Sequence, residues 1–185
     1  MLFRSKRTAY YVLIMNFYDS VENHFNQKLR LSREEKNRYL FEKFIELKED
    51  FDRDRVKHNP EACYLDMKAG NIRWDHHNKK LILIDLGSFG TVYNRGDGKD
   101  NIATYPPIRC KNGYCDCIEF IQKYVIEITL VEIYCKINDL HELPADFTHG
   151  SPYTDRTLKI RRGAFIESLP KELHEQIPHV IQDLQ

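Results

Sequence analysis

Alternating and clustered apolar residues predict short strands in the first half of the chain. Two apolar runs within residues 2–17 flank a polar turn, which is the pattern of a β-hairpin. A second small hairpin is predicted from Asn71–Trp74 and Leu81–Ile84, which are separated by a turn-like polar segment. His76 and His77 fall at the tip of this second hairpin, where we expect solvated turn residues.

Helices are predicted after the first hairpin and in the second half of the chain. A short helical stretch follows the polar residues 16–20, and Ser32 with Glu35 then forms the capping box of a longer helix that should end before Pro60. A strongly apolar helix is predicted over Ile118–Ile137, where it should form core. Weaker helical patterns occupy 161–169 and 171–184. The chain therefore reads as a single domain of the α+β class.

Little periodicity is present between 88 and 112, a segment rich in Gly, Asp and Asn. It is predicted to be a long loop, and loops of this length in compact domains usually have a function.

The overall charge points to no macromolecular partner. The 185 residues carry 28 basic and 28 acidic side chains, so no net field favours nucleic acid or an anionic membrane. The apolar run 9–15 is too short for a signal peptide, and no stretch has membrane-spanning length. We therefore expect an intracellular, cytoplasmic protein that binds neither nucleic acid nor membrane.

Five cysteines, an odd number, favour reduced thiols over a disulfide framework. A zinc site is the alternative, formed by Cys110, Cys115 and Cys117 with His141 or His149. The spacing lacks the paired C-x-x-C knuckles of such sites, so structural thiols are the preferred interpretation.

Two segments carry the residues that phosphoryl transfer requires. They are Tyr64-Leu65-Asp66-Met67-Lys68-Ala69-Gly70-Asn71 and, after the second hairpin, Leu83-Ile84-Asp85-Leu86-Gly87. Phosphoryl transfer needs a carboxylate at the attacking hydroxyl, a cation near the transferred phosphate, and oxygen ligands for magnesium. The set Asp66, Lys68, Asn71 and Asp85 contains all three.

These segments resemble the catalytic loop and the metal-binding loop of eukaryotic-type protein kinases, H-R-D-L-K-x-x-N and D-F-G. The resemblance implies that Asp66 accepts the proton of the substrate hydroxyl and that Lys68 steadies the γ-phosphate of ATP. It also implies that Asn71 and Asp85 hold Mg²⁺ against the phosphates. A lysine two residues after Asp66 is typical of serine/threonine kinases.

The resemblance extends to both sides of these loops. Residues 10–20 are similar to the fifth strand and hinge of a kinase, which places Met15 at the gatekeeper position and Asn16 and Phe17 at the adenine. Thr104-Tyr105-Pro106-Pro107 resembles the end of an activation segment. The implied fold is a protein-kinase-like domain, with a small-lobe hairpin and hinge over 1–18 and a mostly helical large lobe over 19–185.

Several kinase features are missing or altered. There is no glycine-rich loop and no Val-Ala-x-Lys strand, as though the domain began near the fourth strand of the small lobe. Tyr64 and Leu65 replace the usual His and Arg, and Ile108 replaces a usual glutamate. Residues 86–93 mimic a glycine-rich loop, but Asp85 occupies its first glycine position.

Three interpretations follow from these matches and departures. The first is a minimal protein Ser/Thr kinase that moves the γ-phosphate of ATP to a protein hydroxyl. The second is a catalytically inactive remnant that binds a partner kinase or its substrate. The third is a fragment whose missing strands are encoded upstream.

Overall fold

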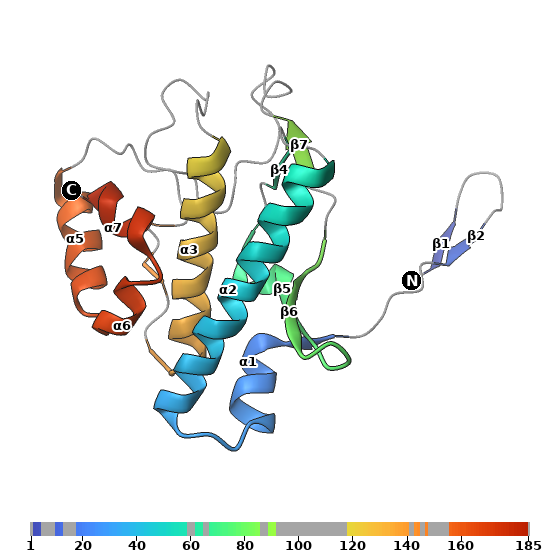
Figure 1. Ribbon diagram of the computed structural model, residues 1–185, viewed down its shortest axis with the longest axis horizontal. Coiled ribbons are helices and arrows are strands. Elements are labelled where there is room, and N and C mark those ends of the chain that lie inside the picture. Colours follow the sequence, from blue (N-terminus) through green and yellow to red (C-terminus); the bar gives the residue numbers. More distant parts are fainter. Residues whose placement is uncertain are drawn as a thin grey trace.

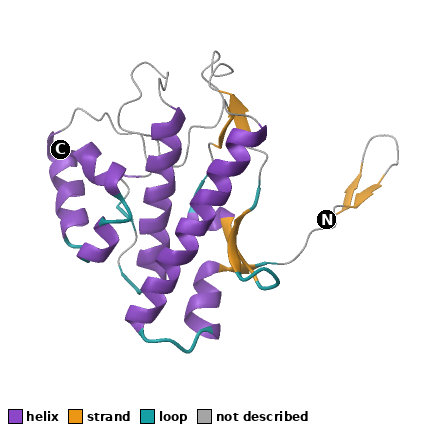
Figure 2. Cartoon of the chain, in the orientation of Figure 1, coloured by secondary structure: helices purple, strands orange, loops and turns teal. Residues whose placement is uncertain are grey.

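The computed structural model describes residues 2–4, 10–12, 18–58, 62–64, 67–85, 89–91, 118–140, 143–144, 147 and 156–184. These residues form a mostly helical α+β structure, as the sequence predicts (Figure 2). Two long helices, α2 (Arg33–His58) and α3 (Ile118–Ile137), lie side by side at its centre (Figure 1). Short strands lie on the α2 side, and the C-terminal helices cover α3.

Helix α2 begins at the predicted capping box. The Glu35 carboxylate accepts hydrogen bonds from the backbone N–H and the hydroxyl of Ser32, at 2.9 and 2.7 Å. The Glu35 N–H in turn donates to Ser32 Oγ at 3.3 Å. Leu40 and Phe44 are buried toward the core, while Ile45 is 43% exposed on the opposite face. The helix ends at His58, before Pro60, as predicted.

The predicted second hairpin is confirmed and belongs to a three-stranded antiparallel sheet. Strand β5 (Ile72–Asp75) pairs with β6 (Lys80–Leu83), and the Asp75 carboxylate accepts the N–H groups of His77 and Asn78 in the turn. The third strand, β3 (Asp19–Ser20), pairs with β5 on its other side. Two residues are too short for any periodicity, so the sequence alone did not indicate β3.

After β3 the chain turns through α1 (Val21–Asn23) and the π-helical turn η1 (His24–Lys28), the short helical stretch that the sequence predicts. The Ser20 hydroxyl caps α1 by accepting the Asn23 N–H at 3.1 Å.

Strands β4 (Ala62–Tyr64) and β7 (Phe89–Thr91) form a separate antiparallel pair. The prediction of a continuous loop over 88–112 is therefore wrong at its beginning. Phe89-Gly90-Thr91 has no alternation to mark it as a strand, and its hydrogen-bonding partner lies in a distant part of the chain. Residues 92–112 lie outside the described residues. The N-terminal hairpin, β1 (Leu2–Arg4) with β2 (Tyr10–Val12), is confirmed.

Helix α3 forms the centre of the core, as predicted. All eight residues from Tyr124 to Val131 are buried, so the helix is enclosed on every side there. The buried Thr129 hydroxyl is satisfied within the helix, because it donates to the Val125 carbonyl at 2.8 Å. Among the described helices, none combines the length and apolar composition needed to cross a membrane.

The C-terminal region forms three helices where two were predicted. They are α5 (Arg156–Glu167), α6 (Lys171–His174) and α7 (Pro178–Leu184). The single helix predicted over 171–184 is interrupted over 175–177. Pro178 then begins α7, because proline lacks an N–H and suits the first turn of a helix. Glu127 of α3 holds this turn, because its buried carboxylate accepts the Val180 N–H at 2.8 Å and contacts His179.

Candidate functional site

The segment from Met67 to Asn71 connects β4 to β5 and forms a tight loop. Met67 is buried in the core and anchors the start of the loop. Lys68 is extended, and its carbonyl accepts the Asn71 N–H at 2.9 Å across the 3₁₀ turn η2 (Ala69–Asn71). This turn fixes the spacing between Lys68 and Asn71.

Glu132 of α3 anchors the same loop by a hydrogen bond to its backbone. Its Oε2 accepts the backbone N–H of Ala69 at 2.8 Å, and its Oε1 accepts from Lys136 Nζ at 2.7 Å. A charge-assisted hydrogen bond thus holds the loop against helix α3. Glu132 was not among the residues singled out from the sequence. The sequence did offer one indication of its role, because Glu132 is an acidic residue in a strongly apolar helix and lies four residues before Lys136.

The backbone brings Asp85 next to this loop. Ile72 and Leu83 are register partners in β5 and β6, and the Ile84 N–H donates to the Asn71 carbonyl at 2.9 Å, one step beyond the strands. Asp85 follows directly and is exposed, with a positive φ of 57°. Aspartate tolerates this conformation better than most residues, and such positions are concentrated at functional sites.

Three of the predicted site residues are therefore described and share one edge of the structure. Lys68 is half-buried, Asn71 is 7% exposed and Asp85 is exposed. The other predicted site residues, Met15, Asn16, Phe17 and Asp66, lie outside the described residues. The cysteines and histidines of the zinc alternative, Cys110, Cys115, Cys117, His141 and His149, also lie outside them.

The donor atoms at this edge suit magnesium bound together with phosphates. Asn71 offers an amide oxygen and Asp85 a carboxylate, and Mg²⁺ is commonly held by one or two such groups plus phosphate oxygens. Within the described ranges, no group of three or more His, Cys, Asp or Glu could hold a metal ion.

A second polar cluster lies beside the β5–β6 turn. The buried Asp19 carboxylate contacts the Lys28 ammonium and the His76 ring. Hydrogen bonds from Lys28 and His76 lower the pKa of Asp19 to about 2. His76 and His77 are exposed in the β5–β6 turn, as predicted, and the His76 ring in addition contacts the Asp19 carboxylate.

His24 lies at the centre of the same cluster. Its ring stacks on Trp74 with centroids 4.1 Å apart, and among the described residues neither ring nitrogen has a hydrogen-bond partner. Burial, with the nearby His76, lowers the pKa of His24 to about 4, so the ring is neutral at neutral pH. The cluster therefore fastens β3 and η1 to the hairpin and has no evident catalytic role.

A groove of about 810 Å³ lies between the start of α2, the end of α3 and α6. Its floor includes Phe41 stacked on Tyr134, and its charged walls include Arg33, Arg38, Glu172 and Glu175. It contains none of the residues that the sequence analysis assigned to phosphoryl transfer.

Comparison with protein-family models, with curated proteins and with solved structures found no match to this chain.

Proposed function

We propose that this protein is an ATP- and magnesium-dependent phosphotransferase that acts on a serine or threonine hydroxyl of a protein. The observation that carries the proposal is the hydrogen bond from the Ile84 N–H to the Asn71 carbonyl. Through it, two segments that contain the residue types required for phosphoryl transfer meet at one edge of the sheet. The β5–β6 hairpin brings the two segments together, because Asn71 directly precedes β5 and Ile84 directly follows β6.

Each residue has a distinct role in this proposal. ATP supplies the phosphoryl group, and Mg²⁺ neutralises the charge on its phosphates. Asn71 and Asp85 hold the metal, Lys68 steadies the γ-phosphate, and Asp66 accepts the proton of the attacking hydroxyl. Met15, Asn16 and Phe17 contact the adenine. Because η2 is fastened to α3 through Glu132, Lys68 and Asn71 keep their spacing without rearrangement of the loop.

The proposal is tested by ATP binding with and without Mg²⁺, measured as a shift in melting temperature. ATP at ten times its Kd should stabilise the protein by about 1.4 kcal/mol, or roughly 3–6 °C for a chain of this size. Asp85→Ala should abolish the magnesium-dependent part of the shift. Asp139→Ala is the matched control, because Asp139 is also exposed and has a similar positive φ of 51°.

Transfer of the γ-phosphate to serine-containing peptides completes the test. Turnover that needs Mg²⁺ and is lost in Asp85→Ala supports the phosphotransferase. No shift at millimolar ATP, together with no turnover, would refute it and favour a binding module that acts on a partner kinase or its substrate.

A further inference from the structure

A small pocket lies directly beside the loop that carries Lys68. Its volume is about 100 Å³, and it is lined by residues of β3, α1, η2, β5 and the last turn of α3. This volume corresponds to roughly three water molecules. It is far below the 300–1,000 Å³ of pockets that hold nucleotide-sized ligands. The pocket therefore suits the end group of a single side chain.

Arg73 supplies a cationic end to this pocket. Its side chain is half-buried and donates a hydrogen bond of 3.3 Å to the carbonyl of Ile72. Among the residues that the structure describes, no carboxylate pairs with it. A guanidinium presents a planar fork of donors that matches a carboxylate or a phosphate.

Ser20 lies next to Arg73 in the sheet. The two residues are register partners in β3 and β5, so their side chains project from the same face of neighbouring strands. The Ser20 oxygen already accepts the Asn23 N–H, which leaves its hydroxyl hydrogen as a donor. Ser20 and Arg73 together offer donors to an anion and both line the pocket.

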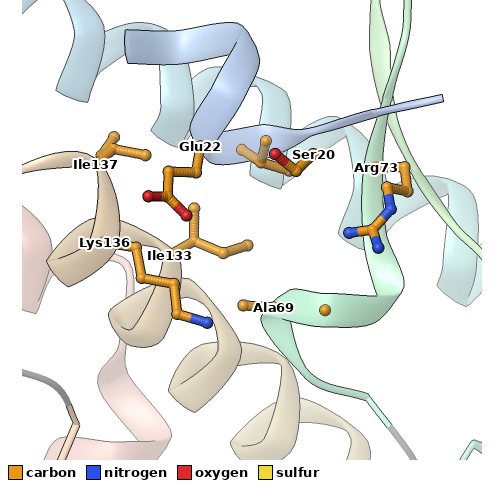
Figure 3. Close-up of a pocket in the computed structure, with 9 residues that line it drawn as sticks. Ser20, Glu22, Ala69, Arg73, Ile133, Lys136 and Ile137 are labelled. Atoms are coloured by element: carbon orange, nitrogen blue, oxygen red, sulfur yellow. The ribbon is translucent and has the colours of Figure 1, made fainter.

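The remaining charges of the pocket lie on its other side. Lys136 is paired with Glu132 at 2.7 Å, and the Glu22 carboxylate lies on the Lys136 side, away from Arg73 (Figure 3). The Lys136 charge is thus offset by Glu132, whereas no carboxylate in the described part of the chain offsets the charge of Arg73. The Arg73 end of the pocket is therefore the end that favours an anion.

We propose that this pocket is a substrate subsite that binds an acidic or phosphorylated side chain flanking the acceptor residue. The inference rests on the proposed phosphotransferase function. Ala69 and Gly70, which line the pocket, follow Lys68 directly in the chain. Because an extended peptide advances about 3.3–3.6 Å per residue, a side chain within a few positions of the acceptor reaches the pocket.

Gly70 gives a way to close the pocket without disturbing the fold. A Cβ added at Gly70 would meet only the Cγ of Lys68, at 4.0 Å, which is an ordinary van der Waals contact. Gly70→Leu should therefore fold and occupy the space that the proposal assigns to the substrate side chain.

The test is direct binding of labelled serine peptides by fluorescence anisotropy, without nucleotide. The peptides are identical except that Asp, phosphoserine, Ala or Arg is placed at each of the three positions on either side of the acceptor. At one position, the Asp or phosphoserine peptide should bind about tenfold more tightly than the Ala peptide. The stronger of the two shows whether a carboxylate or a phosphate is preferred.

The variants separate the subsite from general charge effects. Arg73→Gln and Gly70→Leu should each remove the preference, and Arg73→Lys should restore part of it. Arg161→Gln, which removes an exposed arginine of α5, should leave it unchanged. If melting curves show that Arg73→Gln does not fold, Gly70→Leu decides the question.

Two outcomes would overturn the subsite. The acidic peptides could bind no better than the Ala peptide at every position, or the Arg peptide could bind best and lose its advantage in Glu22→Gln. Failure of the catalytic proposal is distinguishable, because peptide binding needs neither ATP nor turnover. An Arg73-dependent preference without turnover would keep the subsite and reject the phosphotransferase.

Discussion

Replacement of Glu132 should release the loop that carries Lys68 from helix α3. In Glu132→Ala the Ala69 N–H loses its acceptor and Lys136 loses its ion pair. The Glu132 side chain is 16% exposed, so water only partly replaces the lost carboxylate. The substitution therefore tests whether a single hydrogen bond positions the loop.

The cost follows from the two contacts. A hydrogen bond to a charged group contributes about 1.5–3 kcal/mol, and an exposed ion pair four residues apart on a helix contributes about 0.3–0.5 kcal/mol. Glu132→Ala should therefore lower the free energy of unfolding by about 2–3 kcal/mol. Glu132→Gln keeps an acceptor oxygen and should lower it by about 1 kcal/mol. Lys136→Ala removes only the ion pair and should cost less than about 0.5 kcal/mol.

Urea denaturation followed by the fluorescence of Trp74 measures these differences. Trp74 is the single tryptophan of the chain, and it is buried on β5, the strand that follows η2. Hydrogen exchange of the Ala69 amide gives a local readout, which should accelerate in Glu132→Ala but not in Lys136→Ala. If Glu132→Ala unfolds at the wild-type urea concentration with an unchanged Ala69 exchange rate, the proposed anchoring is refuted.

Two further predictions concern buried ionisable groups. Burial raises the pKa of the Glu127 carboxyl, and this group accepts the Val180 N–H. Glu127→Ala leaves that buried N–H without its acceptor, so it should lower the free energy of unfolding by about 3 kcal/mol in urea titrations at pH 7. A loss below about 1 kcal/mol would contradict a capping role. In the folded chain the pKa of His24 is lowered from 6.5 to about 4. Between these two pH values the unfolded chain binds a proton at His24 that the folded chain does not, so the free energy of unfolding should fall as the pH drops from 6.5 to 4. His24→Phe, which keeps a ring against Trp74, should flatten this part of the pH profile measured by thermal denaturation, and an unchanged slope would exclude His24 as its source.

The parts of the fold predicted from the sequence are those stabilised by near neighbours. The capping box of Ser32 and Glu35 and the β5–β6 hairpin depend on hydrogen bonds between residues a few positions apart. The break between α6 and α7 is also local, and the single helix predicted there is wrong although Pro178 follows the break directly. In contrast, β3 and β7 are too short to show a pattern, and each becomes a strand only because a distant segment offers its backbone groups.

The same division applies to the candidate site. The sequence by itself determined which residues could carry phosphoryl transfer, because Lys68, Asn71 and Asp85 are identified by their chemistry and their order along the chain. The predicted hairpin also indicated that Asp85 returns beside Asn71. Only the tertiary structure decided that Glu132 supports the loop from 63 residues away and that Ser20 lies beside Arg73. The physical reason is that a helix satisfies its hydrogen bonds within a few residues. Strand pairing and loop anchoring instead require groups that only the folded chain brings within about 3 Å.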